Sequence, residues 1–205
     1  MQELADGIFH WKARHPKIGL EVSSYFVAAS GTLLNPLMPP EGVEWFDGDR
    51  RPQRALLTNR HHLRDSERFA EAFAIPIACH EAGLHEFAGG PDVKGYAWGD
   101  EVAPGVTALE VGVICPEESA LRIDSGDGFL AFADAVCNYG ELGFPPDEHI
   151  GDDPPAIKRA IRESVARLLD EPFDSLLPAH GDPLVGGGRD ALRGFVEIGA
   201  DRGAA

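Results

Sequence analysis

Cationic side chains are scarce in this sequence: 18 lysines and arginines stand against 34 aspartates and glutamates, a formal net charge of −16 with histidine neutral. A protein that binds nucleic acid, or an anionic membrane surface, needs clustered cations to meet the phosphates. We therefore expect neither nucleic acid nor a membrane as a partner. A small-molecule substrate is compatible with this charge, and no sequence feature indicates an oligomeric state.

Cysteines, long apolar runs and targeting segments are also lacking. The three cysteines, Cys79, Cys115 and Cys137, are odd in number and widely spaced, so they predict neither a disulfide framework nor a C-x-x-C zinc site. No apolar run approaches the ~18 residues of a membrane span. The first residues show no basic segment followed by an apolar one. These features favour a cytoplasmic protein.

Short apolar runs separated by glycine and proline make up most of the chain. Apolar residues are 43% of the sequence, and 24 glycines and 16 prolines punctuate it, a pattern typical of many short strands. Apolar residues at helical spacing predict helices over residues 66–73, 154–169 and 188–198, with Ser66 and Asp153 as N-caps of the first two. Helices outside two sheets would bury every apolar stripe. We predict an α/β (α+β) fold in which residues 1–205 form one domain.

Three strand ends carry side chains that are able to bind metals. His61 and His62 follow a short apolar segment, as do Asp134 and His180 further along the chain. Loops at strand ends are common sites of function, because a rigid scaffold presents an accessible segment. Each residue also has a plainer interpretation: a packed or solvated ring for the histidines, and a turn cap for Asp134. If the strands are neighbours, all four side chains meet at one edge, and this ligand set suits Zn, Fe, Ni or Mn.

The chain resembles the metallo-β-lactamase superfamily at four landmarks taken in order. Residues 57–62 (LTNRHH) stand where the family has its H-x-H-x-D-H loop, and residues 111–121 resemble the segment around P-G-H-T-x-G. Residues 132–136 (FADAV) resemble the strand ending in a metal-bridging Asp, and residues 177–182 (LPAHGD) the turn with a late histidine ligand. Asn35 sits where the family usually has Asp. The resemblance implies a four-layer αββα sandwich with a metal site at the edge of its two sheets.

The metal loop departs from the family pattern. One alignment puts His61 and His62 on the family's Asp-His pair and Asn59 on its second histidine. The other puts Asn59 on the first histidine and His61 on the second. We prefer the first, because the distance to Pro76 then matches the family spacing, but at least two loop ligands are missing either way. Cys115, near the missing histidine of P-G-H, is a replacement thiolate or, in our preferred interpretation, an inert buried thiol.

The number of ligands limits the metal to one ion or none. A dinuclear site needs about seven or eight protein ligands, and a mononuclear site needs three or four. The first hypothesis is a metal-dependent hydrolase acting on a small ester, lactone or thioester. In it Asp134 orients the attacking water or acts as a general base. One divalent ion, zinc in preference to iron, is held by His61, His62, Asp134 and His180.

The second hypothesis is a catalytically degenerate, metal-free member that serves as a binding or structural module. The same four residues then form a hydrogen-bonded cluster, and Arg60 or Arg64 supplies positive charge where a metal is lost. An iron-dependent redox variant would keep the ligands of the first hypothesis, since two histidines and a carboxylate serve both metals.

Two further expectations concern residues outside the candidate ligand set. Glu117 and Glu118 are expected to be solvated turn residues. His10 is expected on the surface of an edge strand.

Overall fold

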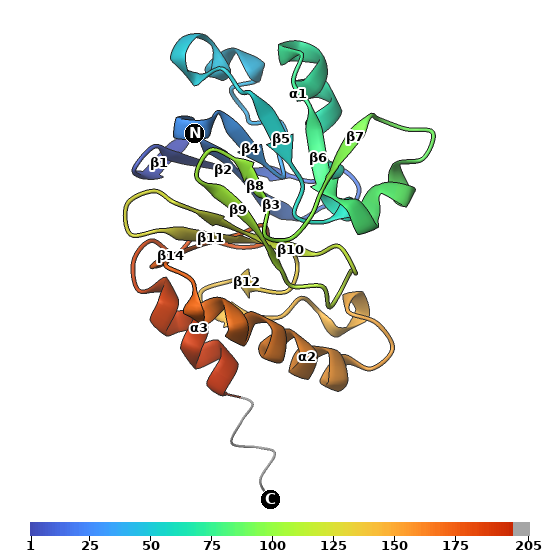
Figure 1. Ribbon diagram of the computed structural model, residues 1–205, viewed down its shortest axis with the longest axis vertical. Helices are drawn as coiled ribbons and strands as arrows, with labels where there is room; N and C mark the ends of the chain where they lie inside the picture. The colour runs from blue at the N-terminus through green and yellow to red at the C-terminus, as the bar shows by residue number, and fades with distance from the viewer. Residues whose placement is uncertain (199–205) are drawn as a thin grey trace, which may run out of the picture.

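The computed structural model describes residues 1–198 and arranges them in two β-sheets that lie face to face, with helices on both outer sides (Figure 1). One sheet has seven strands in the order β1-β2-β3-β4-β5-β6-β7, and the other has five in the order β14-β11-β10-β9-β8. The predicted four-layer αββα sandwich is confirmed. The predicted domain spans residues 1–205, and its last part, residues 199–205, lies outside the described residues.

The elements follow one another along the chain in two halves, one for each sheet. The first sheet consists of β1 Gln2–Ala5, β2 Ile8–Arg14, β3 Glu21–Val27, β4 Thr32–Leu34, β5 Arg54–Leu56, β6 Ile77–His80 and β7 Val93–Tyr96. The second consists of β8 Glu101–Ala103, β9 Val106–Glu110, β10 Ser119–Ile123, β11 Phe129–Phe132 and β14 Ser175–Pro178, and a small hairpin joins β12 Cys137–Asn138 to β13 Leu142–Gly143. The helices are α1 Ser66–Phe73, α2 Pro154–Ala166 and α3 Gly188–Glu197.

Three apolar layers hold the sandwich together. The central layer lies between the sheets, where strand residues such as Tyr25, Leu34 and Leu121 are almost fully buried. A second layer joins the first sheet to α1, and Phe46 lies in its centre with ring contacts to five other aromatic side chains. A third layer joins the second sheet to α2 and α3. Burial of these layers is the main stabilising contribution to the fold.

The helix boundaries follow from local capping. Asp153 accepts a hydrogen bond from the N–H of Ala156 at 3.0 Å, so the predicted N-cap of α2 is confirmed. Helix α1 begins at Ser66 as predicted, but Ser66 is its first helical residue and Asp65 is the N-cap. The prediction of Ser66 as N-cap is therefore wrong. Ser66 is instead buried below the helix, where its hydroxyl has no hydrogen-bond partner.

Parallel strand pairs bring the candidate residues to one edge of the sandwich. Strand β5 runs parallel to β4 and β6, and β11 runs parallel to β14. The carboxyl ends of parallel strands meet at the same sheet edge, where loops collect. The two sheets are joined at this edge, since the Tyr25 hydroxyl donates to the carbonyl of Pro178 and the N–H of Ser119 donates to the carbonyl of Thr58.

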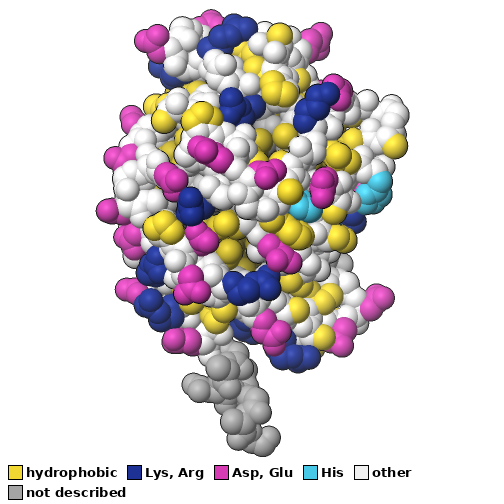
Figure 2. All heavy atoms as spheres, viewed as in Figure 1, with side chains coloured by type: hydrophobic (Ala, Val, Ile, Leu, Met, Phe, Trp, Pro, Cys, Tyr) yellow, Lys and Arg dark blue, Asp and Glu magenta, His cyan; other side chains and the backbone are white. Residues whose placement is uncertain are grey.

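The helices of the described residues are all too short or too polar to cross a membrane. On the face seen in Figure 2, acidic and basic side chains are interspersed, and the basic ones do not form a continuous patch.

His10 does not lie on an edge-strand surface, so that expectation is wrong. Strand β2 is covered by β1 on one side and β3 on the other, and the His10 ring is buried against Tyr25 with centroids 5.1 Å apart. Ser23 Oγ donates its hydrogen to the carbonyl of Gly181, so His10 Nε2 donates to Ser23 Oγ at 2.9 Å. Burial, with the charge of Lys12 adding to it, lowers the pKa of His10 to about 4.

This low pKa makes stability depend on pH. Between pH 6.5 and about 4, His10 is protonated in the unfolded chain but neutral in the folded one, so stability falls as the pH drops through this window. One such proton changes the free energy of unfolding by at most about 1.4 kcal/mol per pH unit. We expect His10→Gln, which keeps an N–H donor, to flatten this slope in urea titrations between pH 6.5 and 4.5. The exposed His149 provides the control, and His149→Gln should show the same dependence of stability on pH as the parent protein. Equal slopes of the free energy of unfolding against pH in both variants would contradict the assignment.

Candidate functional site

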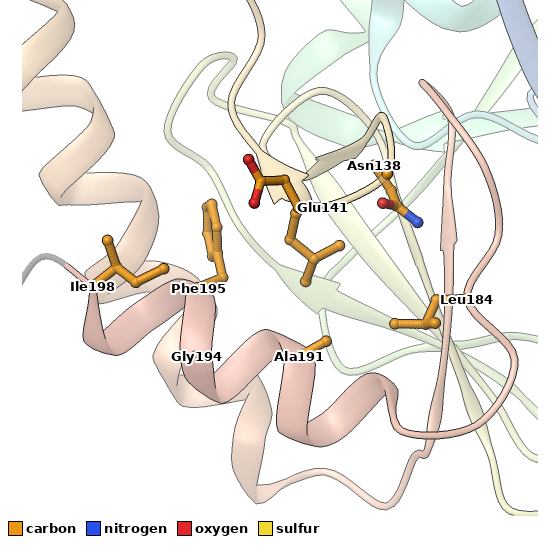
Figure 3. Close-up of a pocket in the computed structure, with 9 residues that line it drawn as sticks. Asn138, Glu141, Leu184, Ala191, Gly194, Phe195 and Ile198 are labelled. Carbon is orange, nitrogen blue, oxygen red and sulfur yellow. The ribbon is translucent and has the colours of Figure 1, made fainter.

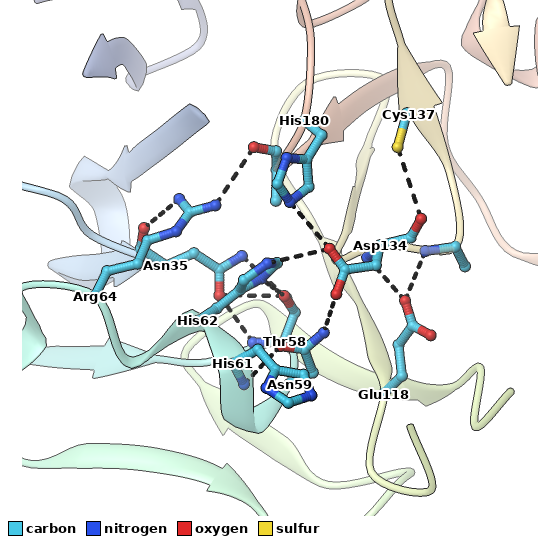
Figure 4. Close-up of polar contacts among 12 residues, drawn as sticks. Asn35, Thr58, Asn59, His61, His62, Arg64, Glu118, Asp134, Cys137 and His180 are labelled. Atoms are coloured by element: carbon cyan, nitrogen blue, oxygen red, sulfur yellow. Dashed lines mark hydrogen bonds and ion pairs between the residues drawn. The ribbon is translucent and has the colours of Figure 1, made fainter. Parts of the chain in front are cut away.

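His62, Asp134 and His180 converge at the edge where the two sheets meet. His62 Nε2 lies 3.3 Å from Asp134 Oδ1, and His180 Nε2 lies 3.0 Å from the same oxygen (Figure 4). One ligand atom from each residue falls within 4.8 Å of the other two. Three segments distant in the sequence therefore place two imidazoles and one carboxylate around a single point.

The loop after β5 aims the His62 ring at Asp134. The loop is a short 3-10 helix, η4 (Arg60–Leu63), and its N-cap Asn59 accepts a hydrogen bond from the N–H of His61 at 3.0 Å. Behind the ring, His62 Nδ1 lies 3.3 Å from Thr58 Oγ1. Asn35 in turn binds both the N–H and the hydroxyl of Thr58. With Nδ1 engaged, Nε2 is the nitrogen that faces the carboxylate.

Asp134 and His180 are held by the loops that follow β11 and β14. Asn59 Nδ2 donates to Asp134 Oδ2 at 2.6 Å, so each carboxylate oxygen has a defined partner. The carbonyl of His180 accepts from the N–H of Asn138 at 3.0 Å, and Gly181 packs directly on Asn138. These contacts fix the backbone from which both side chains project.

His61 does not join this group. Its side chain is exposed, while the neighbouring His62 is buried. Among residues 1–198, the group of histidine, cysteine and acidic side chains close enough to share an ion contains His62, Asp134 and His180. The structure thus brings together three of the four residues predicted as ligands. In a 3-10 turn, adjacent residues point in different directions, which is why only one histidine of the pair reaches the site.

The charge states suit a cation. Burial lowers the pKa of His62 to about 4, and the Asp134 carboxylate opposes this shift. Burial also acts to raise the pKa of Asp134, but the charges and hydrogen bonds of His62 and His180 outweigh it and hold that pKa well below its usual range. Neutral imidazole and ionised carboxylate are the forms in which these side chains bind metals.

Cys115 is not a candidate ligand in the structure. It is buried, and burial, followed by the nearby charges of Glu117 and Glu118, raises the pKa of its thiol to about 12. The thiolate is the form that binds metal. The geometry agrees with our preferred interpretation of an inert thiol.

Arg60 and Arg64 both bind groups other than the three side chains, although the charge of Arg64 acts on His62 and Asp134. Arg60 pairs with Glu117 and Glu86. Arg64 Nη1 donates to the carbonyls of Ser23 at 2.6 Å and Asn35 at 2.8 Å. Its Nη2 donates to the carbonyl of Ala179 at 3.4 Å. Neither guanidinium forms a hydrogen bond with Asp134, so the arginines do not take the position of an ion bound there.

The Arg64 contacts predict a structural effect. We expect Arg64→Met to destabilise the protein by about 2–4 kcal/mol, because carbonyls from three segments each lose a hydrogen bond to the buried guanidinium while the aliphatic stem is kept. Urea unfolding of the purified variant measures this change. The exposed Arg68→Met is the control and should unfold as the parent protein does. Equal stability of both variants would show that Arg64 does not join the segments.

Glu117 and Glu118 contradict the expectation of solvated turn residues. Both side chains are completely buried. Burial, with the charge of Asp134 adding to it, raises the pKa of Glu118 to about 8. Nothing in the local sequence indicates this burial, since neighbouring acidic residues beside proline are typical of an exposed turn.

The sequence matches no family model and no curated protein. Solved structures do match over nearly the whole chain. The metallo-β-lactamase family protein TTHA1429 from Thermus thermophilus is 16% identical, with a TM-score of 0.69, over 98% of this chain and 81% of that one. The DIM-1 metallo-β-lactamase is 9% identical, with a TM-score of 0.74, over 96% of both chains. The chain has the metallo-β-lactamase fold.

A third solved structure matches as well. TTHA1623, solved in a di-iron-bound form, is 22% identical with a TM-score of 0.67, over 88% of this chain and 96% of that one. At these identities the matches show the fold alone. The metallo-β-lactamase fold accounts for the position of the three residues at the sheet edge, as the landmarks in the sequence implied.

Proposed function

We propose that the protein is a hydrolase that uses one divalent metal ion, with His62, Asp134 and His180 as ligands. The observation that carries the proposal is their convergence on one point from three separate loops. Catalytic zinc sites use three protein ligands and keep a further position for water. Zinc is the metal we propose first, and iron is the alternative, since the same ligands serve both.

The distances fit such an ion. In a tetrahedral site with bonds of about 2.0–2.1 Å, neighbouring ligand atoms lie roughly 3.4 Å apart. The two nitrogens lie 3.3 and 3.0 Å from Asp134 Oδ1, so small movements of the side chains would admit the ion. Neither Arg60 nor Arg64 forms a hydrogen bond with Asp134, so no guanidinium holds its Oδ1.

Each residue of the site would have its own role in the reaction. A bound ion lowers the pKa of its water and polarises a carbonyl oxygen of the substrate. His62 and His180 would hold the ion as neutral rings. Asp134 would hold it through Oδ1 and orient the attacking water by its charge, while Asn59 keeps Oδ2 in place.

A small ester, lactone or thioester is the substrate class we propose. The negative net charge disfavours polyanions such as nucleic acids. A hollow of about 290 Å³ lies between the β12–β13 hairpin and α3, lined mostly by apolar groups (Figure 3). None of the three proposed ligands lines this hollow, so the substrate class is proposed from the net charge and not from the hollow.

Metal binding tests the proposal directly. Protein purified without chelator, and apoprotein titrated with zinc, should each contain one ion per chain by mass spectrometry under native conditions. The zinc-loaded form should hydrolyse p-nitrophenyl acetate or a simple lactone or thioester faster than the apoprotein does. Absence of bound transition metal after incubation with excess zinc would refute the proposal.

A metal-free binding module is the second candidate. It is favoured by the direct contacts of His62 Nε2 and His180 Nε2 with Asp134 Oδ1, at 3.3 and 3.0 Å, which hold the three side chains together without an ion. His180→Ala separates the two. Loss of bound zinc and of hydrolysis in this variant supports the enzyme. If the variant folds normally and the parent protein has neither bound zinc nor activity, the module is supported.

A further inference from the structure

Two adjacent carboxyl groups, those of Glu117 and Glu118, lie buried between the loops that carry His62 and Asp134. Both are 0% exposed. Burying a carboxyl group is costly unless hydrogen bonds compensate for the lost water. The partners of these two side chains therefore indicate why acidic residues occupy this position.

Glu118 binds the backbone of the turn that carries Asp134. Its Oε1 accepts from the N–H of Asp134 at 2.9 Å and from the N–H of Ala135 at 2.7 Å. Figure 4 shows Glu118 reaching this turn from the side opposite the histidines. Two N–H groups that share one acceptor fix the direction of the Asp134 side chain, because the turn is unable to rotate without losing both bonds.

Glu117 binds the loop that carries His62. Its Oε1 accepts from the N–H of Arg60 at 3.2 Å, and its Oε2 pairs with Arg60 Nη1 at 3.4 Å. The side chain packs closely on Gly83, where an added Cβ would lie 2.7 Å from Glu117 Cγ. The next residue but one, Ser119, donates its N–H to the carbonyl of Thr58 at 2.8 Å.

Residues 117–119 thus contact both loops from a single short segment. The His62 loop follows a strand of the seven-stranded sheet, and the Asp134 turn follows a strand of the five-stranded sheet. Relative movement of the sheets would separate the two side chains. A segment bonded to both loops opposes that movement.

We propose that Glu117 and Glu118 are positioning residues that set the distance between His62 and Asp134. For its effect on metal affinity this inference rests on the proposed function. Neither Glu117 nor Glu118 belongs to the group of side chains close enough to share an ion. Residues that support metal ligands in this way typically change the affinity ten- to a hundredfold when altered.

Two substitutions at Glu118 separate the effect of side-chain length from the effect of charge. Glu118→Gln keeps the acceptor oxygen and the length of the side chain, whereas Glu118→Asp withdraws the oxygen by one methylene. With Co²⁺ as the probe, we expect Glu118→Asp to bind about ten- to a hundredfold more weakly and Glu118→Gln to stay within about threefold of the parent protein. The visible spectrum of bound Co²⁺ should change only in the Asp variant. Equal losses in both variants, or none in either, would overturn the proposal.

The same comparison at Glu117 extends the test to the His62 loop. Glu117→Asp should bind Co²⁺ more weakly than the parent protein, and Glu117→Gln should bind it about as well as the parent protein does. Glu110, exposed at the other end of the same connection between β9 and β10, is the matched control. Glu110→Asp and Glu110→Gln should both bind Co²⁺ as the parent protein does, and a loss in either would overturn the assignment to Glu117 and Glu118.

A readout in the metal-free protein makes the inference independent of metal binding. The ¹⁵N shifts of the His62 and His180 rings report their hydrogen bonds to Asp134. Glu118→Asp should move both sets of signals and Glu118→Gln should move neither. If the parent protein binds no metal, the proposed function fails while this comparison still decides the inference. Unchanged ring signals in Glu118→Asp would refute the positioning role.

Discussion

Asp134→Asn is expected to abolish metal binding while the fold persists. Asp134 is the one anionic ligand of the three, and its carboxylate is ionised because His62 and His180 hold its pKa low against the effect of burial. An asparagine has the same shape but neither the charge nor a strong donor atom for a divalent ion. We expect the affinity for zinc to fall by about a thousandfold or more, and metal-dependent hydrolysis to fall with it.

Calorimetric titration of the apoprotein with zinc measures this loss. The control is Asp182→Asn, because Asp182 lies two residues after His180 but is exposed and pairs with Lys12. Asp182→Asn should bind zinc as the parent protein does. Circular dichroism should show the same fold in both variants, since an asparagine oxygen still accepts a hydrogen bond from a histidine. Zinc binding by Asp134→Asn within tenfold of the parent protein would remove Asp134 from the ligand set.

Local patterns were sufficient to predict many of the elements. Helix α1 has the predicted bounds, and α2 and α3 begin where predicted, because each combines an apolar stripe at helical spacing with a clear start; α2 ends at Ala166, before the predicted residue 169. The first half of the first sheet was less readable. Strand β1 was not predicted and β2 was expected only as an edge strand, since their burial is created by neighbouring strands rather than by an apolar pattern of their own.

The site was predicted in part, and the limit was backbone conformation. Asp134 and His180 end strands in the sequence and in the structure, so their positions followed from the fold. His61 and His62 were not distinguishable, because only the 3-10 turn of η4 decides which ring faces inward. Glu117 and Glu118 were missed because their partners are backbone N–H groups of distant loops, and these leave no trace in the sequence near them.

Gly181→Ala is expected to have the largest effect on folding of the substitutions considered. Gly181 has φ of +96°, where side chains other than hydrogen are strained, and an added Cβ would lie 1.8 Å from the carbonyl oxygen of Asn138. The neighbouring atoms are backbone, so no side chain is able to move aside. The chain must shift, and the bonds between Asn138 and residues 180 and 182, at 3.0 and 2.7 Å, must lengthen or break. We expect Gly181→Ala to lower the free energy of unfolding by about 3 kcal/mol or more.

Gly140→Ala separates steric overlap from backbone strain. Gly140 has a similar φ of +105°, but an added Cβ would meet nothing within 4 Å. In urea unfolding, Gly140→Ala should lower the free energy of unfolding by about 1–2 kcal/mol, the cost of the unfavourable φ alone. Gly181→Ala should lower it clearly more.

The two glycine variants also distinguish a failed fold from a failed site. If Gly181→Ala stays folded, the turn after β14 has moved, and His180 with it, so both zinc affinity and the ¹⁵N shift of the His180 ring should change. Gly140→Ala should change neither. Equal stability of the two variants, with an unmoved His180 signal, would mean that the close approach of Gly181 to Asn138 does not determine where His180 lies.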